Sequence, residues 1–220
     1  MKNRLTLILA GFFMLCSASS FSQTDSSEIK DFQVGFVPHY AFFYGIRFDI
    51  ERKIPNKDSY LQFTPHFYFN EQTIDYENIS VTSQADYEKI SGLGLGLYHK
   101  MIVYKSPRNI VYLHFAYGGE YSYLEMSYKT YEWMEYYENN LEYYRYGLAE
   151  HNEPINRLKL NLSVGIQINI AQSLYVGSYL GSGFSYSFTD IDIGKFTTNM
   201  TDYAYSGVYI PLGFRIGVMF

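Results

Sequence analysis

The last nine residues of the chain, Leu212–Phe220, constrain its fold more than any other segment. Apolar side chains alternate there with glycine, arginine or methionine, so that Leu212, Phe214, Ile216, Val218 and Phe220 share one face of an extended strand. Successive side chains of a strand point to opposite sides, so this pattern predicts a strand with one apolar face and one small or charged face.

The same alternation recurs in eight segments that turn or loop residues separate. They are residues 32–41, 44–54, 59–70, 90–104, 109–126, 157–170, 174–188 and 206–220. After a first tight turn near Phe42 and Phe43, short connections (55–58, 105–108, 171–173) alternate with long ones (71–89, 127–156, 189–205). This order predicts an all-β protein, an eight-stranded antiparallel up-and-down transmembrane β-barrel with both termini in the periplasm and the long loops outside.

The segment 157–170 indicates which face meets lipid. Leucine, valine and isoleucine occupy its even positions, whereas Lys159, Asn161 and Ser163 occupy odd ones. Most glycines of the predicted strands fall on the polar side, which suits an interior just wide enough for side chains. A soluble barrel of the lipocalin type would turn its polar face to water. Glycines on a water-facing surface would bring no packing advantage. The membrane barrel is therefore the favoured prediction.

The same phase places four basic and three acidic side chains inside the barrel, together with histidines. The predicted lumen network is Arg47, Asp49, Glu51, His66, Lys100, His114, Glu120, Lys159 and Arg215. Unpaired buried charges are costly, so we expect these groups to form ion pairs and hydrogen bonds that plug the lumen. The alternative is a narrow passive channel for small solutes that the same side chains would line.

An enzyme is the less favoured interpretation of the histidines. His114 and Glu120 lie six residues apart on one face, where a histidine–carboxylate pair could activate a nucleophile. Outer-membrane lipases and lipid deacylases, however, resemble one another in having a serine two residues after the histidine. None of the five histidines here has a serine at that position. The sequence therefore predicts no enzymatic activity and no cofactor. No loop has the alternating acidic ligands of a calcium site, so no metal ion is expected either.

The longest predicted loop, 127–156, is rich in tyrosine and glutamate. Its candidate recognition residues are Tyr131, Trp133, Tyr136, Tyr137, Tyr143 and Tyr144. Tyrosine and tryptophan offer a large contact area at a low entropy cost, which suits binding of an extracellular protein or glycan. Two structures remain open. Glutamates spaced by three or four residues would share one side of a short helix. Alternatively, the strands extend beyond the membrane and the tyrosines pack on one another.

Residues 1–22 have the pattern of a secretory signal peptide. Lys2 and Arg4 precede an apolar run, Leu5–Leu15, and a small-residue segment, Ser17–Ser22. The run is shorter than the roughly 20 residues of a membrane-spanning helix. We expect Sec-type export and cleavage after Ser22, which leaves one domain, 23–220, without cysteine. Its net charge of about −7 argues against nucleic acid as a partner.

The signal segment, the strand pattern and the C-terminal strand together resemble small Gram-negative outer-membrane barrels of the OmpA/OmpX type. In that family a terminal phenylalanine after alternating apolar residues is an assembly signal, which corresponds here to Phe214, Ile216, Val218 and Phe220. The resemblance implies an outer-membrane location, lipid around the barrel and recognition by the barrel-assembly machinery. It also implies a mostly plugged scaffold with adhesive or binding loops at the cell surface. An accessory subunit of a secretion or uptake machine remains an alternative.

Overall fold

The computed structural model describes residues 30–43, 45–71, 87–138, 141–189 and 197–220, and the predicted signal peptide lies outside them. The strands are β1 (Phe32–Phe36), β2 (Gly45–Lys53), β3 (Ser59–Glu71), β4 (Tyr87–Lys105), β5 (Val111–Glu138), β6 (Leu141–Asn169), β7 (Leu174–Phe188), β8 (Gly207–Tyr209) and β9 (Leu212–Met219). A 3₁₀ helix, η1 (Pro38–Phe43), lies between β1 and β2. Within the described ranges, no helix is long and apolar enough to cross a membrane.

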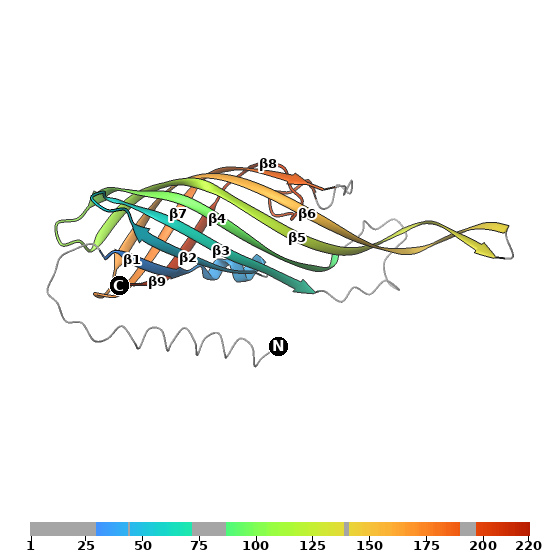
Figure 1. The fold of residues 1–220 in the computed structure, drawn as a ribbon, viewed down its shortest axis with the longest axis horizontal. Coiled ribbons are helices and arrows are strands. Elements are labelled where there is room, and N and C mark those ends of the chain that lie inside the picture. The colour runs from blue at the N-terminus through green and yellow to red at the C-terminus, as the bar shows by residue number, and fades with distance from the viewer. Residues whose placement is uncertain (1–29, 44, 72–86, 139–140, 190–196) are drawn as a thin grey trace, which may run out of the picture.

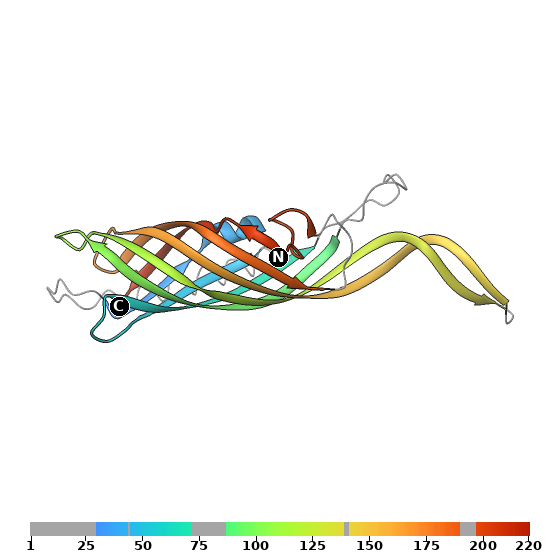
Figure 2. The ribbon, with the colours of Figure 1, turned by 90° about the horizontal axis from the view of Figure 1, so that it is seen from above.

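Eight of the strands close into a ring (Figures 1 and 2). Strands β1 to β7 each pair antiparallel with the next along the chain, and β9 pairs with both β7 and β1. The short β8 pairs only with β7, where Gly183 meets Tyr209, so it does not enter the ring. The predicted all-β fold, an eight-stranded antiparallel barrel with up-and-down topology, is confirmed.

Two predicted strands are interrupted, and a proline stands at each interruption. β1 ends at Phe36 instead of residue 41, and Pro38 begins η1, so the predicted tight turn near Phe42 and Phe43 is the end of a 3₁₀ helix. The predicted strand 206–220 is divided into β8 and β9 around Pro211. Proline has no N–H to donate to a sheet ladder, which explains why pairing does not run through these positions.

Strands β5 and β6 continue far beyond the barrel wall. β4 follows β5 as far as Tyr128 and β7 follows β6 as far as Asn156, whereas β5 and β6 pair with each other up to Glu138 and Leu141. Residues 129–138 and 141–150, here called the ribbon, project from one end of the barrel (Figures 1 and 2). At about 3.3 Å per residue the ribbon is roughly 33 Å long. The loop and the short helix predicted for 127–156 were therefore wrong, and the alternative of extended strands is confirmed.

The two faces of the barrel wall differ sharply in polarity. Large apolar side chains are exposed on the outside, among them Leu61, Phe63, Phe67, Leu93, Leu95, Leu97, Leu158, Leu160, Leu162 and Val164. The alternate positions point inward and are buried, and many of them are polar or charged. An apolar belt of this extent around a polar interior is the reverse of a water-soluble barrel.

Glycines allow this narrow interior to hold large side chains. A Cβ atom at Gly118 of β5 would overlap the carbonyl oxygen of Leu97 and lie 2.7 Å from the Cα of Tyr98. At the adjacent Gly119, which points outward, a Cβ would lie 3.2 Å from its nearest neighbours. The inward position therefore admits no side chain unless the backbone of β4 moves.

We expect Gly118→Ala to lower the free energy of unfolding by about 2 kcal/mol, because the added methyl group meets backbone atoms that cannot rotate away. Gly119→Ala is the matched control on the outer face, and its change should stay within about 0.5 kcal/mol, the usual range for substitutions outside the packed interior. Urea unfolding of the two refolded variants in detergent measures both values. Equal losses in the two variants would show that inward glycines have no special role in packing.

Candidate functional site

The end of the lumen nearest the short turns is filled by four side chains, here called the Glu51 cluster. The Nζ of Lys100 lies 2.7 Å from one oxygen of Glu51, and the guanidinium of Arg215 pairs with the other. Lys100 also donates a hydrogen bond of 2.9 Å to the side chain of Gln167. All four side chains are at most 2% exposed. Each charge at this level is thus removed from water and paired, as a buried ion pair requires.

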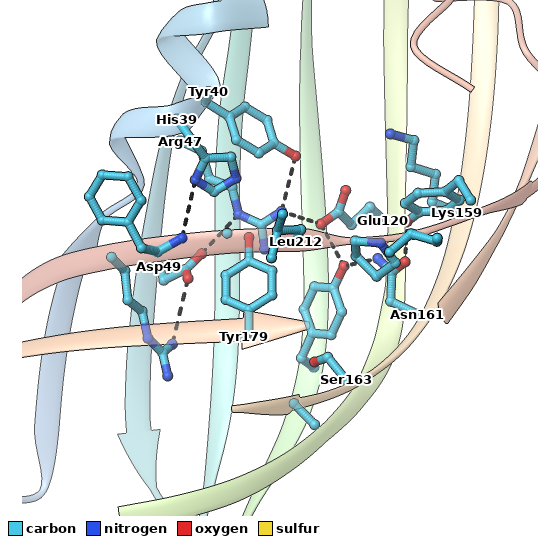
Figure 3. Close-up of a pocket in the computed structure, with 18 of the residues that line it drawn as sticks. His39, Tyr40, Arg47, Asp49, Glu120, Lys159, Asn161, Ser163, Tyr179 and Leu212 are labelled. Carbon is cyan, nitrogen blue, oxygen red and sulfur yellow. Dashed lines mark hydrogen bonds and ion pairs between the residues drawn. The ribbon is translucent and has the colours of Figure 1, made fainter. Parts of the chain in front are cut away.

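A second group of charges, the Arg47 cluster, lies further from the turns (Figure 3). The Nε of Arg47 is 3.0 Å from Asp49, and its Nη1 is 2.5 Å from Glu120. Glu120 also accepts a hydrogen bond of 2.5 Å from the hydroxyl of Tyr98. Arg215 lies 3.6 Å from Asp49 and joins the two clusters. The charged pairs thus extend across the barrel between strands that are distant in sequence.

The histidine–carboxylate pair considered from the sequence is not formed. His114 contacts Arg215, whose Nη2 lies 3.4 Å from its Nε2, and Glu120 is bound by Arg47 and Tyr98. Six residues along a strand correspond to about 20 Å, so two side chains at that spacing cannot meet. Within the described segments, no group of three histidine, cysteine, aspartate or glutamate side chains could hold a metal ion.

His66 instead meets a serine. Its Nε2 lies 2.9 Å from the Oγ of Ser122, and its Nδ1 lies 3.2 Å from the carbonyl oxygen of Thr64. Both side chains are 1% exposed, and neither lines the cavity described next. The contact satisfies two buried polar groups.

Around the Arg47 cluster the lumen contains a cavity of about 670 Å³. Asp49 and Glu120 line it at the level of that cluster (Figure 3), and Arg157 and Lys159 line it from β6. Six tyrosines contribute to the lining: Tyr40, Tyr68, Tyr98, Tyr179, Tyr203 and Tyr209. Near the ribbon end, buried apolar side chains pack together: Tyr68, Ile90, Leu124, Met126, Tyr128, Ile155 and Ala204. The lumen is thus filled at both ends and hollow between them.

Sequence reasoning missed Arg157 as a residue of the lumen. It stands at the first position of the predicted strand 157–170, two residues before Lys159, and so shares its face. Its guanidinium donates to the hydroxyl of Tyr68 at 3.0 Å and to the carbonyl oxygen of Tyr203 at 3.2 Å. Carrying the alternation to the end of that segment would have found it.

The helix η1 takes the place of the missing half of β1. β1 and β9 pair only from Gln33 with Met219 to Phe36 with Ile216, so residues 212–215 of β9 have no strand partner on that side. The N–H of Phe214 donates instead to Nδ1 of His39 at 3.4 Å (Figure 3). Tyr40, the next residue of η1, accepts a hydrogen bond of 3.1 Å from Arg47. Side chains of η1 therefore close part of the wall.

The residues of the predicted assembly signal lie along β9 and just after it. Phe214, Ile216 and Phe220 are exposed on the outer face, whereas Val218 on the same face is covered. The backbone of Phe220 donates to the carbonyl oxygen of Phe32 at 2.8 Å, and the two aromatic rings lie 6.1 Å apart. The start of the first strand therefore lies beside the end of the last strand.

The ribbon carries the predicted recognition residues on both of its faces. Tyr136 stacks on Tyr143 across the strands on one face, with ring centroids 5.3 Å apart. Trp133 meets Tyr146 at the same distance on the other face. Such cross-strand pairs contribute roughly 0.2–1 kcal/mol each, and they support a two-stranded sheet that would be marginal alone.

One face of the ribbon is open and acidic as well as aromatic. This aromatic face consists of Tyr131, Trp133, Glu135, Tyr137, Glu142, Tyr144, Tyr146 and Leu148, as the pairing register requires. Trp133 is 67% exposed and Tyr137 is 71% exposed. The hydroxyl of Tyr144 donates to Glu142, which raises the pKa of that hydroxyl. Large rings in water beside carboxylates are features of a contact surface.

Comparison with known proteins adds one similar structure. No protein-family model matches the sequence, and no curated protein is similar to it. Among solved structures, the fold is similar to the crystal structure of CarO from Acinetobacter baumannii, with a TM-score of 0.41 and 9% sequence identity. The match covers 89% of this chain and 100% of that chain.

Proposed function

We propose that this chain is an outer-membrane barrel with a plugged lumen, which acts as a surface scaffold and recognises an extracellular protein through the ribbon. The orientation of the two wall faces is the observation that carries the membrane location. Leucine, valine and phenylalanine side chains are exposed around the outside, and the charged clusters are enclosed. A barrel in lipid requires this arrangement because its outer face meets hydrocarbon.

Orientation in the membrane follows from the lengths of the connections. The turns between β2 and β3, β4 and β5, and β6 and β7 are short, whereas the ribbon leaves the opposite end. Outer-membrane barrels place short turns in the periplasm and long extensions outside. This supports periplasmic termini, Sec-type export with a removed signal peptide and insertion by the barrel-assembly machinery. A part in a larger secretion or uptake machine is compatible with the same orientation.

The plug is supported by the pairing within the Glu51 cluster. Lys100, Glu51 and Arg215 are buried and hold one another from three different strands. A channel for small solutes would need water to pass through this level, where paired charges and aromatic side chains stand instead. The scaffold is therefore the better-supported function, and the side chains at this level do not call for an enzymatic role.

The charges of the ribbon favour a basic partner. Its two strands contain five glutamates, Glu132, Glu135, Glu138, Glu142 and Glu150, against Lys129 and Arg145. On the aromatic face the only charged residues between 131 and 148 are Glu135 and Glu142. Arginine or lysine side chains of a partner can pair with these carboxylates and lie over the tyrosine and tryptophan rings. A protein with a basic surface therefore fits this face best.

The single tryptophan of the chain reports directly on this face. We expect an arginine-rich peptide to change the fluorescence of Trp133 in a saturable and salt-sensitive manner, and a glutamate-rich peptide of equal length to leave it unchanged. Glu135→Gln should weaken the response about tenfold, because it removes one of the two carboxylates beside the rings. Glu132→Gln changes the same charge on the opposite face and is the matched control.

Two outcomes would contradict a basic protein as the partner. Equal weakening by Glu132→Gln and Glu135→Gln would mean that only the net charge of the ribbon matters. A fluorescence response to neutral oligosaccharides, with none to the arginine-rich peptide, would assign the aromatic face to a glycan.

A further inference from the structure

The lumen contains more basic than acidic side chains. Among the described residues it holds five cations, Arg47, Lys100, Arg157, Lys159 and Arg215, and three anions, Asp49, Glu51 and Glu120. The three anions are taken by Arg47, Lys100 and Arg215. Within the part of the chain that the structure describes, Arg157 and Lys159 have no carboxylate partner, and both line the cavity.

The direct contacts of these two residues are with neutral groups. Arg157 is 5% exposed and donates only to neutral oxygens, and its buried Nε has no hydrogen-bond partner. Lys159 makes no hydrogen bond to a described residue, and its Nζ lies 4.9 Å from the ring centre of Tyr209. An enclosed cation without a directly paired carboxylate is disfavoured, so two of them on the same face of β6 define a site for an anion.

The size and lining of the cavity describe the rest of the ligand. Its volume of about 670 Å³ falls within the range of small-molecule sites, which runs from about 300 to 1,000 Å³. Tyrosine rings form much of the wall around Arg157 and Lys159. Such a lining accommodates an organic group beside the anionic one, since each ring offers a flat apolar surface.

The cavity also reaches the outer surface of the barrel wall. Ile210, Leu212 and Phe214 line it, although they are 60%, 66% and 45% exposed on the apolar outer face. Leu212 (Figure 3) and Phe214 belong to the part of β9 that is not paired with β1, and Ile210 precedes that strand. An apolar chain can therefore extend from the cavity between these side chains toward the surrounding lipid.

We infer that the cavity is a binding site for an amphiphilic anion, whose phosphate or carboxylate group is held by Arg157 and Lys159. Its apolar part passes the side chains of Leu212 and Phe214 at the edge of β9. The site is separate from the ribbon, so either one can fail experimentally while the other stands.

Calorimetric titration of the refolded protein in neutral detergent tests this site. Hexyl phosphate should bind saturably, and hexyltrimethylammonium, which has the same chain and the opposite charge, should not bind. Lys159→Gln should weaken hexyl phosphate binding at least tenfold, and it removes no hydrogen bond between described residues of the barrel. Arg157→Gln should weaken it further, and Lys105→Gln, which changes an exposed cation paired with Asp58, should have no effect.

Each outcome bears on one part of the inference. Absence of saturable hexyl phosphate binding by the folded protein overturns the site, as does unchanged affinity in both Lys159→Gln and Arg157→Gln. Inorganic phosphate that binds as tightly as hexyl phosphate would keep the anion site and overturn the path past Leu212. Tighter binding of hexyl phosphate than of inorganic phosphate supports a ligand drawn from the membrane.

Discussion

Replacing Glu51 with glutamine should lower the free energy of unfolding by about 3–5 kcal/mol, the range for removing one partner of a buried ion pair. The substitution keeps the shape of the side chain and removes the charge that Lys100 and Arg215 share. Arg215 then retains the carboxylate of Asp49 at 3.6 Å and the ring of His114, and Lys100 retains the neutral Gln167. Urea unfolding in detergent, followed by the mobility shift between folded and heated protein on a gel, measures the loss.

An exposed ion pair of the same barrel provides the control. Lys105 and Asp58 pair near the short turns with side chains that are 26% and 61% exposed. Asp58→Asn should change the free energy of unfolding by at most about 1 kcal/mol, because water screens such pairs. If Glu51→Gln has no larger effect than Asp58→Asn, the Glu51 cluster does not hold the strands together.

Removing the three charged side chains of the Glu51 cluster should turn a silent barrel into a conducting one. We expect the unmodified protein to insert into a planar bilayer without discrete current steps, since Glu51, Lys100 and Arg215 fill the level between the cavity and the short turns. The triple variant Glu51→Ser, Lys100→Ser and Arg215→Ser replaces them with small side chains and leaves none of the three charges unpaired. Single-channel recording should then show reproducible openings.

Lys159→Ser is the matched control for conductance, because Lys159 lies on the cavity side and does not belong to the Glu51 cluster. It should remain silent. A folded triple variant without openings would show that the buried rings of Tyr60 and Tyr175 close the barrel by themselves. Openings in the unmodified protein would contradict the plug and favour the narrow channel.

The barrel itself was predictable because one physical rule, the period of two, governs every strand in it. Leu158, Leu160 and Leu162 alternate with Lys159 and Asn161, and the structure places the two sets on opposite faces. The rule weakens in the ribbon, where tyrosine and glutamate occupy both faces and no contrast of polarity remains. Extended strands and a helical loop were therefore equally compatible with the residues of 127–156.

The partners within the lumen could not be derived from the pattern. Alternation assigns a face to each residue, whereas contact across the barrel depends on the register between strands. Arg47 binds Glu120 across 73 residues of sequence, and no local feature marks that pairing. The position of η1 was hidden for a similar reason, since Pro38 shows where a strand can end and not where the following residues fold.

The number of paired residues differs between neighbouring strands, and this difference determines where the barrel unfolds locally first. Four residue pairs join β1 to β9, whereas 28 join β5 to β6. Local opening follows the regions with the fewest contacts, so amide hydrogen exchange should be fastest along β1 and β9. Closing the same seam brings the two ends of the chain together, which is the contact of greatest sequence separation and the slowest to form. The junction that completes the cylinder is therefore also the last step of its folding.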